Sequence, residues 1–99
     1  MKNNINYTSN EPIVYVLVIE TEIDDHHTQF VPTMYVSNDK QTLMRFMDSK
    51  FHTKLSDVKA SNKISNISYE FSEDVASISY NEDYKEYNIH YTITTANTI

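Results

Sequence analysis

The sequence predicts an α+β fold, with a single mostly antiparallel sheet of about five strands and one helix packed on one face. Two observations lead to this prediction. In the last third of the chain, apolar and polar residues alternate at the two-residue period of strands, and residues 13–19 form a continuous apolar run that is typical of a buried strand. In the middle third, apolar residues recur three and four positions apart, as in an amphipathic helix. The expected order is β-β-α-β-β-β within a domain at residues 12–99, after a flexible N-terminal arm at residues 1–11.

Two strands are expected before the helix. Residues 13–19 are apolar on both alternating faces, which is typical of a central strand covered on both sides. A polar loop at residues 24–27 separates this strand from a second one at residues 28–36, which Pro32 interrupts. Because proline cannot donate a hydrogen bond to a neighbouring strand, the second strand is expected at an edge or with a bulge there.

The helix is expected to begin after Asn38, which is a good N-cap and has Gln41 three residues later as a capping-box partner. An apolar stripe then extends over about 12 residues and would pack on the sheet; its members are Leu43, Phe46, Met47 and Phe51. Residues 52–63 are more polar, and we expect a connecting segment there, with or without a short helical turn, and with His52 just past the end of the helix.

The last third reads as a three-stranded meander, with turns at residues 72–74 and 81–83. The chain has no glycine, so positive-φ turn positions are expected to fall to Asn81 and Asp83, since Asn and Asp tolerate that region best among the remaining residues. Four tyrosines fall on the predicted core face of the meander: Tyr69, Tyr80, Tyr87 and Tyr91.

The absence of both glycine and cysteine restricts the chemistry that the chain can perform. Phosphate-binding loops, the dinucleotide fingerprint and the nucleophile elbow all need glycine. Without cysteine there is no disulfide framework, thiolate nucleophile or thiolate zinc site, so His, Asp and Glu are the remaining strong metal ligands. We therefore expect no cofactor and a protein that is not an enzyme.

One short segment holds candidate metal ligands, namely Asp24, Asp25, His26 and His27. Adjacent residues of an extended chain point to opposite faces, so no more than two of the four would converge. A catalytic zinc site typically takes three protein ligands, and the missing one would come from His52 or His90. A solvated loop is the favoured interpretation of the segment, and the metal site is its alternative.

Charge is unevenly distributed along the chain. The net charge is -6, which disfavours direct nucleic-acid binding because that affinity depends on Lys and Arg. Basic residues gather in the helix and connector, whereas the last third is acidic. Carboxylates in turns can serve solubility alone, but an acidic surface would also dock on a basic groove. The candidate partner-binding residues are Glu70, Glu73, Asp74, Glu82, Asp83, Tyr84 and Glu86.

The N-terminal residues and the length of the apolar runs indicate where in the cell the protein is expected. Met1 and Lys2 are followed by asparagines instead of an apolar signal core. The longest apolar run, residues 13–19, is far shorter than the roughly 18 residues that a membrane span needs. We therefore expect a soluble, cytoplasmic protein without a membrane partner.

The strand-to-helix joint at residues 33–47, TMYVSNDKQTLMRFM, follows a predicted hairpin. It resembles the ββα opening common in small phage and mobile-element proteins of low-GC bacteria. Many small acidic phage proteins of this kind inhibit host defence, and anti-CRISPR proteins are among them. The resemblance implies a non-enzymatic inhibitor that acts in the host cytoplasm. Its acidic surface would dock on a basic nucleic-acid-binding groove of a host protein complex.

Other functions remain open. A homo-oligomeric protein that sequesters a small ligand such as a nucleotide, or a metal-dependent hydrolase, is one alternative. Its site would lie at a subunit boundary, since a single sheet-and-helix layer leaves little room for a deep pocket. A host regulatory adaptor is another alternative. Exposed edge strands could also pair with a second copy of the chain to form a homodimer.

Overall fold

The computed structural model describes residues 13–23, 28–29 and 32–96. The N-terminal arm expected at residues 1–11 lies outside them. Six strands and one helix are described, in the order β1 (Val14–Ile23), β2 (Thr28–Gln29), β3 (Thr33–Ser37), α1 (Lys40–Ala60), β4 (Ile64–Phe71), β5 (Val75–Glu82) and β6 (Lys85–Ala96). The predicted α+β class and element order are confirmed, with the expected second strand present as two pieces, β2 and β3, on either side of Pro32.

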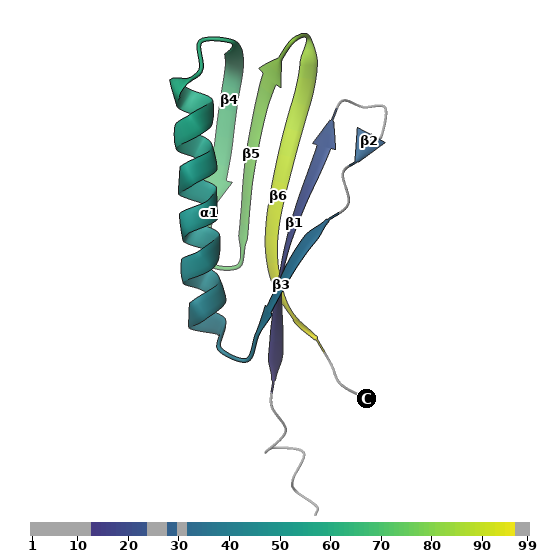
Figure 1. The fold of residues 1–99 in the computed structure, drawn as a ribbon, viewed down its shortest axis with the longest axis vertical. Helices are drawn as coiled ribbons and strands as arrows, with labels where there is room; N and C mark the ends of the chain where they lie inside the picture. The colour runs from purple at the N-terminus through teal and green to yellow at the C-terminus, as the bar shows by residue number, and fades with distance from the viewer. Residues whose placement is uncertain (1–12, 24–27, 30–31, 97–99) are drawn as a thin grey trace, which may run out of the picture.

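All strand pairs of the sheet are antiparallel, and the strand order is β2-β1-β6-β5-β4. The first and last long strands of the chain are neighbours, since β1 pairs with β6 from Val14↔Ala96 to Ile23↔Tyr87. The other side of β1 pairs with β3 and, further along, with β2. Strands β2 and β3 therefore form one edge of the sheet, as predicted, and β4 forms the other (Figure 1).

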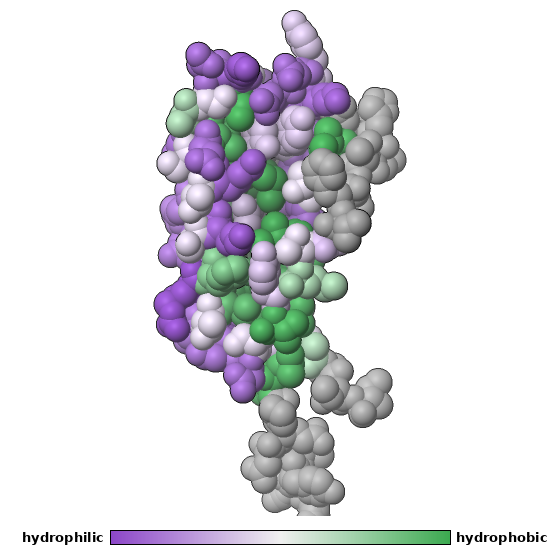
Figure 2. Space-filling model, in the orientation of Figure 1, coloured by the Kyte–Doolittle hydropathy of each residue, from purple (hydrophilic) through white to green (hydrophobic). Residues whose placement is uncertain are grey.

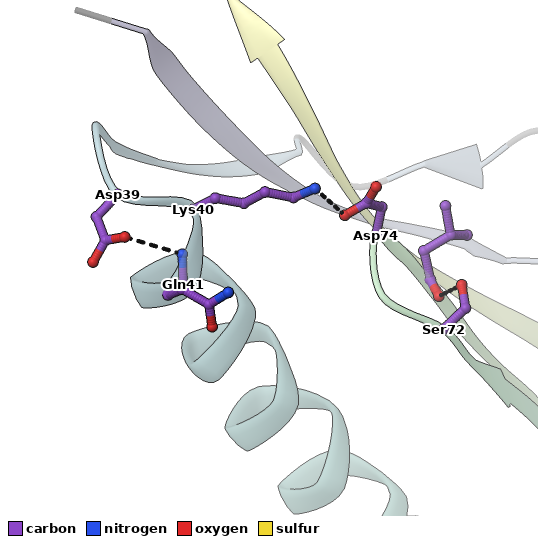
Figure 3. Close-up of polar contacts among 6 residues, drawn as sticks. Asp39, Lys40, Gln41, Ser72 and Asp74 are labelled. Atoms are coloured by element: carbon purple, nitrogen blue, oxygen red, sulfur yellow. Dashed lines mark hydrogen bonds and ion pairs between the residues drawn. The ribbon is translucent and has the colours of Figure 1, made fainter.

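The N-terminus of α1 is capped by Asp39, so the prediction of Asn38 as the N-cap is wrong. Gln41 N–H donates to Asp39 Oδ1 at 3.2 Å (Figure 3), and the Thr42 hydroxyl donates to Asp39 Oδ2 at 2.8 Å. Asp39 N–H itself donates to Ser37 Oγ at 3.0 Å. This bond turns the chain at residue 38 and leaves Asp39 as the last extended residue before the helix.

The helix is 21 residues long and ends at Ala60, so the predicted helix of about 12 residues and the connector at residues 52–63 are both wrong. The apolar stripe continues past Phe51 through Leu55 and Val58, at the same spacing. One stripe of apolar residues suffices to attach a helix to a sheet, so polar residues between Leu55 and Val58 do not end the helix. The buried residues of the helix are Leu43, Met47, Phe51, Leu55 and Val58.

The hydrophobic core lies between α1 and the facing side of the sheet. Phe51 is at its centre and is almost fully buried. The Phe51 ring lies 4.9 Å from the Phe71 ring and 5.7 Å from the Tyr91 ring, between centroids. Burying a large apolar side chain contributes about 1.5–3 kcal/mol, so the helix is attached mainly by this stripe. The other fully buried large side chains are Leu17, Met47, Ile78 and Val58.

The helix covers one face of the sheet, and this corrects two predictions. Strand β1 is not covered on both faces: Leu17 is buried under the helix side, whereas Val16 and Val18, which point to the other face, are half-buried. Tyr69 is half exposed instead of being in the core, because it lies on the edge strand β4. The predicted core positions of Tyr80, Tyr87 and Tyr91 are confirmed, with Tyr87 half-buried against the core.

Positive backbone φ angles occur at Asn66, Asp83 and Tyr84 among the described residues. The prediction for Asp83 is confirmed and the one for Asn81 is wrong. Asn81 pairs with Glu86 inside the β5–β6 ladder. Because Glu82 pairs with Lys85, the hairpin loop contains only Asp83 and Tyr84, and both adopt left-handed geometry. Asn66 lies in β4, where the pairing with β5 shifts register between residues 65 and 68.

Candidate functional site

The acidic residues predicted to form one binding surface lie at two ends of the molecule. Glu73 and Asp74 form the turn between β4 and β5, and Glu82 and Asp83 lie at the turn between β5 and β6. Strand β5 runs between the two turns, and eight residues at about 3.3 Å each separate them by roughly 25 Å. Glu70 belongs with the first turn and Glu86 with the second. The structure therefore brings only some of the predicted residues together.

Asp74 has a structural partner inside the chain. Its Oδ1 atom lies 3.0 Å from Lys40 Nζ and is itself shielded from solvent (Figure 3). The Asp74 carboxylate raises the pKa of Lys40 above its ordinary value, so the ammonium stays charged. The Ser72 N–H and the Ser72 hydroxyl both donate hydrogen bonds to Val75 O, at 2.8 and 2.9 Å, and close the same turn. This end of the sheet is thus held together by its own polar groups.

The tip of the β5–β6 hairpin presents an aromatic ring directly to solvent. Tyr84 is fully exposed and has φ 64°, next to Asp83 with φ 55°. Two-residue hairpin loops with two positive φ angles favour Gly, which has no Cβ, and Asn or Asp, whose short polar side chains form local hydrogen bonds, whereas larger side chains such as tyrosine are strained there. Strained residues concentrate at functional positions. An exposed tyrosine in such a position is therefore a candidate contact residue.

A hollow of about 430 Å³ lies beside this tip, lined by Lys63, Ser65, Asn81, Glu82, Asp83 and Tyr84. Two carboxylates and an aromatic ring at one hollow suit a cationic side chain, since an arginine makes bidentate bonds to carboxylates and stacks on rings. We call Glu82, Asp83 and Tyr84 the hairpin tip. All three residues were among the partner-binding candidates predicted from the sequence. Only the structure shows that they lie at the opposite end of β5 from the turn with Glu73 and Asp74.

A second and larger hollow lies on the helix side of the sheet, between α1 and strands β1 and β3. It measures about 700 Å³, and we call it the α1–β1 groove. A helix about 10 Å wide covers roughly two strands spaced 4.8 Å apart, so part of the sheet remains uncovered. Figure 2 shows hydrophobic residues in a band between the hydrophilic outer surface of the helix and the β2–β3 side. The sequence predicted little room for a deep pocket in one chain, and it did not predict this groove.

Aromatic rings and lysines line the α1–β1 groove together. Lys50 Nζ lies 5.4 Å from the Phe46 ring centroid and 5.7 Å from that of Tyr35. Lys54 Nζ lies 5.7 Å from the Tyr80 centroid. These contacts are in the range of cation–π attraction. These two lysines are four residues apart, and this spacing would have placed them on one face of a helix. The signal was missed because residues 52–63 were not expected to be helical.

The aromatic residues of the groove are packed against one another. The Tyr80 and Tyr87 rings are stacked, with centroids 5.0 Å apart and 5° between their planes. Tyr35 meets Phe46 edge to face at 4.6 Å. Burial, with a smaller effect of the neighbouring Tyr80, raises the pKa of Tyr91 to about 12. The groove therefore has a closely packed aromatic lining, in which the Tyr91 phenol stays neutral at neutral pH.

The candidate metal ligands Asp24, Asp25, His26 and His27 lie outside the described residues. His52 lies inside α1, not past its end, with its Nδ1 atom 2.8 Å from Asp48 Oδ1. His90 alternates with the buried residues Ile89 and Tyr91, so it faces the side of the sheet opposite the helix. The two histidines thus lie on opposite sides. Within residues 13–23, 28–29 and 32–96, no group of three His, Asp or Glu residues is arranged to hold a metal ion.

The edge strand β3 exposes apolar residues on the face without the helix. Met34 and Val36 are 63% and 64% exposed. They stand opposite Val18 and Val16 of β1 and share a face with them. Pairing of this edge with a second copy of the chain stays a prediction.

Comparison with known protein families found no match, and neither curated proteins nor solved structures gave one. In the described part of the chain, no helix is long and apolar enough to cross a bilayer.

Proposed function

We propose that this protein is a non-enzymatic inhibitor that docks its hairpin tip on the basic groove of a partner protein. The observation that carries the proposal is Tyr84, fully exposed at the end of β5 in a backbone conformation that glycine adopts more easily. Tyrosine is enriched at interface hot spots. A strained and solvent-exposed position does not favour a tyrosine. A partner protein that buries the Tyr84 ring accounts for its presence there.

The charge around the tip supports a basic partner. Glu82 and Asp83 precede Tyr84 in the chain and line the same hollow, where Lys63 is the one basic residue of the described lining, and the whole chain carries a net charge of -6. An acidic protein is steered toward a positively charged cleft, and Arg side chains there would meet both carboxylates and the ring. Grooves built for nucleic acid carry clustered Lys and Arg side chains of this kind. Within the proposal, the protein occupies such a groove in the host cytoplasm, as an anti-defence protein of anti-CRISPR type would.

The opposite acidic turn is not part of this proposed contact. Asp74 Oδ1 pairs with Lys40 Nζ at 3.0 Å, and the two turns lie at opposite ends of β5, roughly 25 Å apart. This restricts the proposed contact to the hairpin tip and the neighbouring Glu86, and it supplies a matched control: Glu73, an exposed acid of the other turn.

The test is affinity capture from the lysate of the native host, followed by mass spectrometry. The tip variant combines Glu82→Lys with Tyr84→Asn, and the control variant is Glu73→Lys. We expect a nucleic-acid-binding protein to be captured by the unmodified chain and by the control, and to be lost with the tip variant. Added nucleic acid should compete for the same partner. Equal capture by the tip variant, or a partner that has no basic groove, would contradict the proposal.

A further inference from the structure

We propose that the α1–β1 groove binds a free nucleotide, with the base on its aromatic floor and the phosphate at the lysines of α1. This site is on a different part of the molecule from the hairpin tip and does not depend on the docking function. The groove volume of about 700 Å³ lies within the range of 300–1,000 Å³ that is usual for small-molecule sites.

The floor of the groove offers surface for a planar ring. That surface is the half-buried ring of Tyr87, and the buried Tyr80 stacks on its other side and supports it. Tyr35 and Phe46 form the aromatic wall on the β3 side. Stacking of a base on an aromatic side chain contributes about 1–3 kcal/mol. Because these rings are already packed against each other, little side-chain freedom remains to be lost on binding.

The helix wall offers donors for a phosphate. Lys50 and Lys54 are four residues apart, so their Cβ atoms lie about 6 Å from each other on one face, and both side chains line the groove. Ser49 and Thr53 line it beside them and add two hydroxyl donors. Asp57 is the one carboxylate among the described lining residues, and it can accept hydrogen bonds from ribose hydroxyls. In a chain with net charge -6, this wall is a local site for an anion.

The overall charge favours a mononucleotide over a nucleic-acid strand. A strand would bring many phosphates against an acidic protein, and affinity for strands depends on many Lys and Arg contacts. The groove offers two lysines, which match the charge of one phosphate group. We therefore assign the site to a free nucleoside phosphate.

The first experiment is isothermal titration of the full chain with AMP, GMP, CMP and UMP, and separately with adenosine, inorganic phosphate and a ten-residue oligothymidylate. We expect at least one monophosphate to bind about tenfold more tightly than adenosine or phosphate alone. No binding of any monophosphate at about 1 mM would overturn the proposal. Phosphate binding as tight as that of the nucleotides would reduce the groove to an anion site, and tighter binding of the oligonucleotide would refute a free nucleotide as the occupant.

The second experiment uses variants with a matched control. Lys50→Gln combined with Lys54→Gln should raise the Kd of the best monophosphate about tenfold or more. Lys59→Gln is the control, because Lys59 Nζ also lies over a ring, 4.8 Å from the Tyr69 centroid, but lies outside the groove. Its Kd should stay within about twofold. Equal weakening by both changes would overturn the assignment, and circular dichroism confirms that each variant is folded.

Discussion

Lys40 Nζ lies 3.0 Å from Asp74 Oδ1, and this ion pair joins the first residue of α1 to the turn between β4 and β5 (Figure 3). The two residues are 34 positions apart in the sequence (74 minus 40). At the same turn, Ile93 N–H donates to Asp74 O at 2.8 Å. The turn thus connects the start of the helix with β6, and Asp74 has a structural role in the fold.

Charge reversal tests this ion pair. Lys40→Glu and Asp74→Lys should each lower the melting temperature, because each places two like charges at ion-pair distance. The double variant should recover part of the loss, since it restores opposite charges with their positions exchanged. Thermal unfolding at low and high salt measures this coupling, which salt should weaken. If the losses of the single variants simply add in the double variant at low salt, the two side chains are not coupled.

The second half of α1 packs on the core, and this can be measured. Leu55→Ala should lower the free energy of unfolding by about 2–5 kcal/mol, because it removes a buried side chain and leaves a cavity. Ser56→Ala, on the exposed neighbour, should change it by about 0.5 kcal/mol or less. Urea denaturation of both variants gives the comparison. A cost for Leu55→Ala no larger than that of the control would mean that the helix does not pack beyond Phe51.

The strained hairpin tip predicts a stabilising substitution. Tyr84→Gly should raise the free energy of unfolding by about 0.5–1 kcal/mol, because glycine takes a φ of 64° without steric cost. Lys85→Gly, one residue later and inside β6, should lower it by a similar amount, about 0.5–1 kcal/mol. Chemical denaturation distinguishes the two. A destabilised Tyr84→Gly protein would show that the tyrosine ring stabilises the fold, which would contradict a strained position kept for partner binding.

Alkaline pH should destabilise the fold in a way that depends on Tyr91. Its pKa rises from the ordinary value of 10.0 to about 12, so above pH 10 the unfolded chain loses the phenolic proton while the folded chain retains it. Stability is then fully present below pH 10 and is lost as pH rises toward 12, by about 1 kcal/mol at pH 11 from this group. The raised pKa of Lys40 acts in the same direction.

Urea denaturation at pH 9 and pH 11 measures this loss in the unmodified chain and in Tyr91→Phe. The variant should lose less stability between the two pH values, because the phenol is gone and the ring remains. Identical losses in the two proteins would contradict a neutral, buried Tyr91 hydroxyl.

Much of the fold follows from residues close together in the chain. Alternation in the last third predicts β4, β5 and β6, and Pro32 predicts the edge at β2 and β3, because these signals arise within a few residues. The end of α1 was missed because Leu55 and Val58 are separated by polar residues. Asp39 replaces Asn38 as the cap because the Ser37 hydroxyl binds Asp39 N–H, which is a contact that composition does not reveal.

The sequence by itself determined the order of the elements, the acidic charge, and the lack of the glycine and cysteine chemistry that many active sites need. Tertiary structure alone decided that β1 pairs with β6, that the two acidic turns lie at opposite ends of β5, and that Lys50 and Tyr35 share a groove. The physical reason is the distance along the chain over which each kind of interaction acts. Periodicity and turn preference act between neighbours in the chain, whereas strand pairing and the width of sheet that a helix leaves uncovered depend on residues far apart.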